Sequence, residues 1–209
     1  MNAVEILDYS GVALFAATGA LAASRKQLDI IGFVFLAALT GTGGGTVRDL
    51  VLDVPVFWVA QPVYILVCVV TAVCLYFTAH LAESRYRWLL WLDGAALAAY
   101  CVFGAYKGLT VSGSAVVAVV MGMLTGTLGG ILRDVLSDEP SVLLRREIYV
   151  TAAGAGAAVY VVADALGAPL ALAAFAGFAA AFALRACALA LDWQLPTYRS
   201  RPGRPADKI

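Results

Sequence analysis

Charged residues are scarce in this sequence. Only 13% of the 209 residues are charged and 62% are hydrophobic, whereas about a quarter of the residues in a soluble domain are charged. This composition excludes an ordinary soluble protein and leaves no room for a second, soluble domain. Positive and negative side chains balance at 14 each, and no basic surface stands out, so nothing supports nucleic-acid binding or a soluble partner.

The residue types that carry most catalysis and metal binding are also few. His80 is the only histidine, and the four cysteines lie in apolar stretches without a CxxC spacing, which is typical of small packing residues. The nucleophile and zinc signatures GxSxG and HExxH are absent. The glycine-rich stretch GTGGGTVRD lacks the GK[ST] ending of a phosphate loop. We therefore predict that the chain is not an enzyme.

Long apolar runs predict an all-α membrane protein with seven transmembrane helices, because one such helix needs about 20 mostly apolar residues. The predicted spans are 4–23, 29–53, 62–82, 88–107, 114–138, 147–164 and 168–190. They form one transmembrane domain, residues 1–191, followed by a polar tail, residues 192–209. Lysine and arginine concentrate after the first, third and fifth spans and in the tail, which predicts an outside N-terminus and a cytoplasmic C-terminus.

The sequence contains an internal repeat. A shift of 85 residues aligns Asp8–Tyr64 with Asp93–Tyr149, with 16 of 57 positions identical, and TGTGGGTVRDLVLDVP then faces TGTLGGILRDVLSDEP. Each copy holds three spans, so the second copy enters the membrane from the opposite side and the two repeats are inverted. We place repeat one at 1–84, repeat two at 88–166 and an extra helix at 168–190.

Glycines cluster near the middle of the second and fifth spans. Glycine costs about 1 kcal/mol relative to alanine inside a helix, so we predict that both helices are broken there by a kink or an unwound turn. Freed carbonyls and threonine hydroxyls would then line a wet path and suit a hard monovalent cation. The alternative is that the glycines only allow close helix packing. The candidate ion-path residues are Thr40, Gly41, Thr42, Gly43, Gly44, Gly45, Thr125, Gly126, Thr127, Gly129 and Gly130.

Several charged side chains also fall inside spans, where an ionisable group is costly and needs a partner. The predicted ion pairs are Arg48–Asp8 and Arg133–Asp93, with Asp49 and Asp134 as competing or additional partners. The two arginines lie on opposite sides of the membrane midplane. A structural strut and a gate or pore-lining charge both fit this arrangement.

The last two spans carry stripes of small residues. Ala152 and Gly156, and then Ala173, Gly177 and Ala181, recur at a spacing of four, which predicts close helix packing within or between subunits. Arg185 lies near the cytoplasmic end of the seventh span, so we expect it to reach the lipid headgroups and assign it no transport role.

The paired motifs GGGTVRD, residues 43–49, and GGILRD, residues 129–134, resemble those of the prokaryotic branch of the trimeric intracellular cation (TRIC) channel family. The resemblance implies a homotrimer in the inner membrane of a bacterium or archaeon. Each subunit would conduct monovalent cations, including K⁺, through its own pore between the second and fifth helices. No cofactor is expected; the ligands we expect are permeant K⁺ and bound lipid. Leu128 stands where a symmetric motif would have glycine, so the fifth helix is expected to be less unwound.

Two other function classes remain open on the sequence. Members of the same branch are also catalogued as glycine transporters, so a carrier for a small zwitterion such as glycine is the alternative. A membrane scaffold without any flux is the third class. It predicts that alanine at Gly44 or Gly129 leaves activity in cells unchanged.

Overall fold

A computed structural model of the chain describes residues 3–81, 84–143 and 147–196. Its helices are α1 (Ala3–Arg25), α2 (Ile30–Val51), α3 (Phe57–Ala60), α4 (Val63–Thr78, extended by a 3-10 turn, Ala79–Leu81), α5 (Arg85–Ser112), α6 (Ala115–Leu136), α7 (Val150–Ala165) and α8 (Leu170–Leu191). An isolated bridge joins Glu147 to Gln194. Most of the expected polar tail lies outside the described residues.

The expected all-α membrane architecture is confirmed. Among the described residues, six helices are long and apolar enough to cross a membrane, and α7 is a shorter apolar helix of 16 residues. These seven helices correspond to the seven spans expected from the sequence. Within the described ranges, the α-helix that no expected span covers is α3, a single turn in the connection between α2 and α4.

The two repeats have the same local structure at both ends of their central helices. Asp29 caps the start of α2 by accepting from the backbone N–H of Gly32 at 2.8 Å, and Ser114 caps α6 by accepting from Val117 at 3.4 Å. Such caps satisfy N–H groups that lack a partner within the helix. After the helices, Asp53 and Asp138 adopt left-handed backbone conformations, with φ of 52° and 48°.

The central helices contain no unwound turn. Every residue of α2 and of α6 is α-helical, including the stretches Gly41–Gly45 and Gly126–Gly130. The prediction of an unwound turn was wrong because it weighed only the cost of glycine to an isolated helix. In a packed bundle, a missing side chain also lets a second helix approach, and the contacts made by these glycines show that use.

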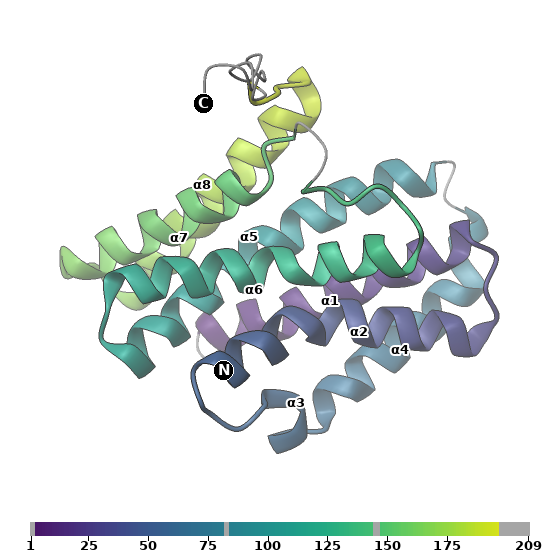
Figure 1. Ribbon diagram of the computed structural model, residues 1–209, viewed down its shortest axis with the longest axis horizontal. Coiled ribbons are helices and arrows are strands. Elements are labelled where there is room, and N and C mark those ends of the chain that lie inside the picture. The colour runs from purple at the N-terminus through teal and green to yellow at the C-terminus, as the bar shows by residue number, and fades with distance from the viewer. Residues whose placement is uncertain (1–2, 82–83, 144–146, 197–209) are drawn as a thin grey trace, which may run out of the picture.

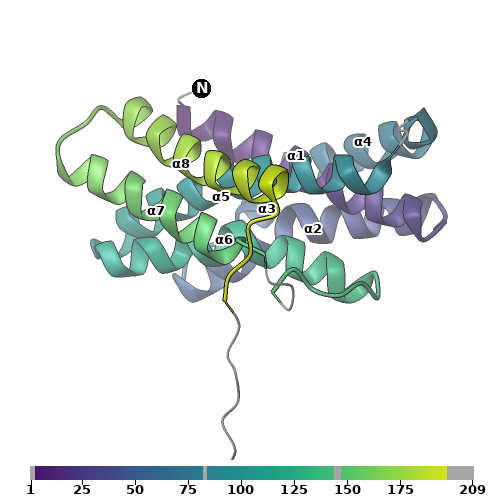
Figure 2. The ribbon, with the colours of Figure 1, turned by 90° about the horizontal axis from the view of Figure 1, so that it is seen from above.

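Figure 1 shows how the helices are arranged. The central helices α2 and α6 pack against each other, α1 packs against α2, α4 and α5, and α5 packs against α6, α7 and α8. In Figures 1 and 2, α7 and α8 run side by side along one flank of the bundle. The contact between α2 and α6 therefore joins the first repeat to the second.

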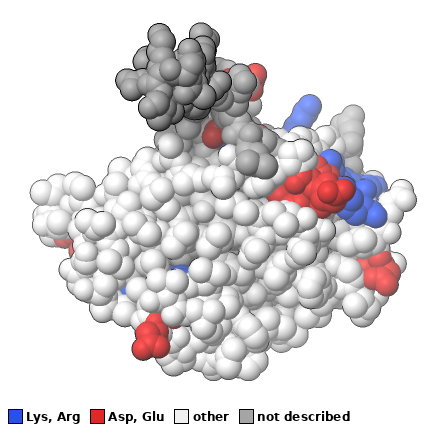
Figure 3. Space-filling view, in the orientation of Figure 1, with Lys and Arg blue, Asp and Glu red and all other residues white. Residues whose placement is uncertain are grey.

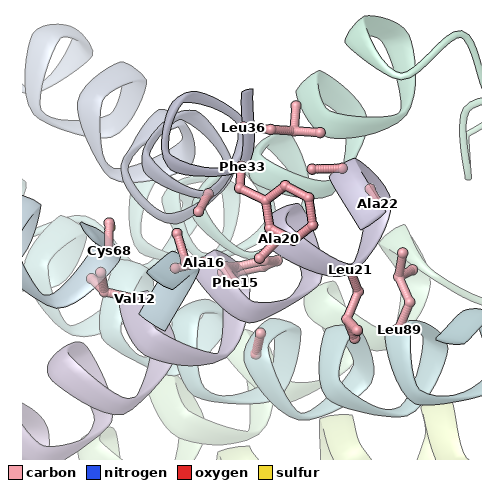
Figure 4. Packing of buried hydrophobic residues seen from close by; sticks show 14 of the residues in the cluster. Val12, Phe15, Ala16, Ala20, Leu21, Ala22, Phe33, Leu36, Cys68 and Leu89 are labelled. Atoms are coloured by element: carbon pink, nitrogen blue, oxygen red, sulfur yellow. The ribbon is translucent and has the colours of Figure 1, made fainter. Parts of the chain in front are cut away.

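The buried apolar residues form two cores. The first gathers residues of α1, α2 and α4, including Phe15, Phe33 and Leu36, which lie close together in Figure 4, and is completed by residues of α5 such as Leu89. The second core is built by α5 to α8. Here a Cβ on Gly156 would lie 2.6 Å from the Cβ of Ala181, so the small-residue stripes of α7 and α8 pack against each other within one subunit.

Candidate functional site

The two glycine motifs meet where α2 crosses α6. A Cβ on Gly129 would lie 2.5 Å from the carbonyl oxygen of Thr40, and one on Gly44 would overlap the carbonyl oxygen of Thr125. Because these residues exchange under the 85-residue shift, the repeat axis passes through this contact. The crossing is thus tight and symmetric, and it brings the first glycine motif against the second.

The four threonines of the motifs lie in the same stretches of α2 and α6. The backbone carbonyls of Thr40 and Thr125 form the crossing, and the hydroxyls of these two residues lie beside Gly19 of α1 and Gly104 of α5. All four threonines are buried, and each hydroxyl donates to the carbonyl four residues earlier in its helix. These bonds are Thr40 to Leu36 (2.6 Å), Thr42 to Ala38 (2.7 Å), Thr125 to Met121 (2.6 Å) and Thr127 to Met123 (2.7 Å). A hydroxyl that donates in this way keeps its oxygen lone pairs as acceptors, so each threonine can still offer an oxygen to a cation.

The remaining motif glycines contact other parts of the bundle. The space that a side chain would need at each of these glycines is occupied by a neighbouring residue. These neighbours are Cys68 and Val12 at Gly41, Leu132 at Gly43, Phe57 at Gly45, Leu97 and Cys101 at Gly126, and Tyr149 and Asp93 at Gly130. Gly41 and Gly126 thus serve packing within their own repeats. Gly45 and Gly130 instead border the charged groups at the two ends of the crossing.

Arg133 is the centre of a buried charge cluster at the end of the bundle where α6 finishes. Its guanidinium lies 2.6 Å from the carboxylate of Asp93 and 2.8 Å from that of Asp134. The second oxygen of Asp134 accepts from the backbone N–H of Val142 at 3.0 Å. The predicted Arg133–Asp93 ion pair is therefore present, with Asp134 as an additional partner.

The cluster at the opposite end, where α2 finishes, differs from the prediction. Arg48 pairs at 2.7 Å with Asp49, which was expected as a competing or additional partner, and not with Asp8. The carboxylate of Asp8 accepts a hydrogen bond from the Tyr64 hydroxyl, and Lys107 of α5 lies 2.8 Å from Asp49. The expected Arg48–Asp8 pair is wrong. Tyr64 is the partner of Asp8 and Lys107 is a second partner of Asp49, and the comparison of the two repeats did not reveal either contact.

The guanidinium of Arg48 lies among aromatic rings instead. It lies 4.9 Å from the ring of Phe103 and 5.7 Å from that of Phe57, contacts that stabilise a buried cation. Neither of its terminal nitrogens has a hydrogen-bond partner within the described part of the chain. Asp49 resembles Asp134 in one respect, because its second oxygen accepts from a backbone N–H eight residues later, at Phe57 (2.9 Å).

Arg185 is also placed differently from the expectation. It is 1% exposed and does not reach the surface. Its guanidinium donates to Glu147 at 2.7 Å and to the carbonyl of Ile148 at 3.3 Å, and lies 5.1 Å from the ring of Tyr149. The seventh membrane helix thereby holds the segment that leads into α7. The headgroup prediction was wrong because hydropathy gives the depth of a residue but not which face of its helix is buried.

Two cavities lie at opposite ends of the crossing, and each is lined by charged residues of the cluster at its end. The α2-end cavity, about 400 Å³, is lined by residues that include Asp8, Tyr64, Phe103, Lys107 and Thr110. The α6-end cavity, about 10 Å³, is lined by residues that include Arg25, Asp93, Arg133, Asp134 and Glu139. The structure thus holds an open vestibule at one end and a nearly closed one at the other.

Sequence reasoning missed three side chains of this site, Tyr64, Tyr149 and Lys107. Tyr64 and Tyr149 are identical partners under the 85-residue shift, and this signal could have identified them. Lys107 has Ala22 as its repeat counterpart, so the repeat gives no hint of it. Its only signal was a lysine near the end of an apolar span.

Comparison with known proteins agrees with this architecture. A family model described as glycine transporter matches residues 5–80 and 90–165. The UPF0126 inner membrane protein YadS of Escherichia coli is 36% identical over 195 residues, which cover 92% of this chain and 94% of that protein. A TRIC channel orthologue from Rhodobacter sphaeroides is 53% identical with a TM-score of 0.90, covering 92% and 100% of the two chains. Another TRIC cation channel structure is 30% identical with a TM-score of 0.84, covering 95% and 98%.

Two inverted three-helix repeats that cross at paired glycines, with a further helix outside the repeat, define a class of multi-pass membrane protein. The chain belongs to the TRIC channel family, which here includes proteins described as UPF0126 membrane proteins and as glycine transporters. The solved relatives are channels, and the chain accordingly is not an enzyme.

Proposed function

We propose that this protein is a channel for monovalent cations, permeable to K⁺, with one pore per subunit between α2 and α6 in a homotrimer. The observation that carries the proposal is the pair of carboxylate-containing cavities at opposite ends of the α2–α6 crossing. The Rhodobacter sphaeroides structure, described as a TRIC trimeric intracellular cation channel orthologue, supports the same function.

The ion path runs from one cavity to the other past the motif glycines and threonines. Asp8 attracts cations at the α2 end, and Asp93 and Asp134 do so at the α6 end. Between them, threonine hydroxyls and helix carbonyls replace water around the ion, as oxygen ligands do in other cation pores. Because α2 and α6 touch at Gly44 and Gly129, conduction requires these helices to separate slightly.

A carrier for a small zwitterion such as glycine is the second candidate. It is supported by the family model described as glycine transporter and by the inverted repeat, which in carriers places the substrate where the repeats meet near the membrane midplane. A carrier must change conformation in every cycle, so its flux saturates with substrate. An open channel shows flux that rises nearly linearly with the gradient.

Recording from purified protein in a planar bilayer under asymmetric KCl tests the proposal. We expect discrete openings that reverse near the K⁺ equilibrium potential and do not respond to glycine added to one side. A silent bilayer together with saturable glycine uptake into liposomes would refute the channel and support the carrier. Empty bilayers and liposomes prepared without protein are the controls.

A further inference from the structure

The α6-end cavity is covered by ion pairs that join the end of α1 to the connection after α6. The guanidinium of Arg25 lies 3.2 Å from the carboxylate of Glu139, and the ammonium of Lys26 lies 3.7 Å from the same oxygen. Lys26 also donates to the backbone carbonyl of Asp138 at 3.4 Å. In Figure 3 acidic and basic side chains meet near one end of a face that is otherwise almost uncharged. We call Arg25, Lys26 and Glu139 the clasp.

The clasp belongs to the wall of the cavity that contains the Arg133 cluster. Arg25 and Glu139 line this cavity together with Asp93 and Asp134, and about 10 Å³ remains free inside it. Arg25 is further held in place by the ring of Tyr86, whose centre lies 4.6 Å from the guanidinium carbon. The free space is about enough for one water molecule, so the clasp and its neighbours leave no passage for a hydrated ion.

The inverted repeat provides an internal comparison for this closure. Under the 85-residue shift, Arg25, Lys26 and Glu139 correspond to Thr110, Val111 and Val54, none of which is charged. At that end of the bundle the cavity has about 400 Å³ of free space, and Thr110 and Val111 line it. The same backbone motif therefore has an open mouth where the clasp is missing and a closed mouth where the clasp is present.

We propose that the clasp is a gate, which closes the α6 end of the ion path and opens when α1 and the connection after α6 separate. This inference rests on the proposed channel function. The clasp side chains are 21% to 37% exposed, and ion pairs of this kind are weak and reversible. Opening also frees the Glu139 carboxylate beside Asp93 and Asp134, so the opened mouth attracts cations.

Chemical access to the cavity tests the gate without any measurement of ion flow. Ser137 lines the α6-end cavity and is 5% exposed. In detergent-solubilised protein carrying Ser137→Cys, we expect Glu139→Gln to raise the rate of modification by a charged methanethiosulfonate reagent about two- to five-fold, the ratio that loss of a partly exposed ion pair produces. The chain without Ser137→Cys gives the background from its native cysteines.

Two further variants make the result specific. Replacing Arg25 and Lys26 by glutamine removes the clasp from its other side, so it is expected to give the same increase and to add nothing to Glu139→Gln. Asp192→Asn removes an exposed carboxylate from the same end of the bundle and is expected to leave the rate unchanged. Equal rates in the Ser137→Cys protein with an intact clasp and in both clasp variants of it would overturn the gate.

Planar bilayers then connect the gate to conduction. Clasp variants are expected to raise the open probability about two- to five-fold while the single-channel current stays the same. A conducting wild type with unaltered open probability in every clasp variant refutes the gate and leaves the channel standing. A silent wild type refutes the channel and the gating of ions with it, while thiol modification still decides whether the clasp closes the cavity.

Discussion

Arg133 and Arg48 occupy equivalent positions in the two repeats, but they form ion pairs with different numbers of carboxylates. Arg133 lies between Asp93 and Asp134 and forms an ion pair with each of these carboxylates. Among the described residues Arg48 forms an ion pair with Asp49 alone, and Lys107 also neutralises Asp49. Repeat symmetry therefore preserves the positions of these charges without preserving their energetic roles.

This difference predicts unequal effects of removing the two arginines. Arg133→Met leaves two buried carboxylates without their cation and is expected to cost about 3 to 5 kcal/mol of stability, as loss of one partner of a buried ion pair typically does. Arg48→Met leaves Asp49 paired with Lys107 and is expected to cost clearly less. Thermal unfolding in detergent, followed by tryptophan fluorescence, measures both variants against the wild type.

A larger loss of stability in Arg48→Met than in Arg133→Met would contradict the conclusion that Arg133 contributes more to the stability of the fold. If Arg48→Met folds normally and changes the single-channel current in bilayers, then Arg48 contributes to the ion path and not mainly to stability. Its position beside the α2-end cavity, over the ring of Phe103, is consistent with such a role.

At the scale of the helices, the crossing of α2 and α6 depends on two glycines. Gly44→Ala places a methyl group against the backbone of α6, and Gly129→Ala does the same against the backbone of α2. A backbone cannot move aside as a side chain can, so each change is expected to destabilise the fold by about 1 to 3 kcal/mol and to reduce flux. Cation flux into liposomes and thermal unfolding measure the two effects.

Gly43→Ala is the matched control, because it lies on the same helix and its new methyl group meets only the end of the Leu132 side chain, at 2.7 Å. A flexible leucine can shift, and alanine favours the helix, so this variant is expected to keep wild-type stability and flux. Unchanged activity in Gly44→Ala and Gly129→Ala would contradict the role of the crossing in transport and support a scaffold without flux.

The sequence was sufficient to predict the helices and the repeat but not the contacts between helices. Hydropathy identified all seven spans, and the 85-residue shift paired Asp29 with Ser114 and Asp53 with Asp138, which the structure shows in matching caps and turns. The glycine motifs are helical because they pack against another helix. Helix propensity describes an isolated helix and does not include this packing. The partner of Asp8 depended on Tyr64, from a different helix of the same repeat.

At the scale of the whole molecule, the two ends of the bundle differ in charge as well as in closure. Arg25, Lys26 and Arg85 lie at the end that carries the clasp, and lysine and arginine concentrate on the cytoplasmic side of membrane proteins. The clasp is therefore predicted to face the cytoplasm, and the α2-end cavity to face the outside. Cations arriving from outside then enter the open vestibule first and stop at the closed clasp.

Site-directed labelling tests this orientation. Gln61 is exposed at the α2 end and Asp192 is exposed after α8, at the other end. In intact cells we expect a membrane-impermeant maleimide to modify Gln61→Cys but not Asp192→Cys, which reacts only after the cells are opened, and the unaltered chain reports the native cysteines. The reverse pattern would contradict the predicted orientation and place the clasp outside the cell. Extracellular ions, and not cytoplasmic ions, would then screen the attraction between Arg25 and Glu139.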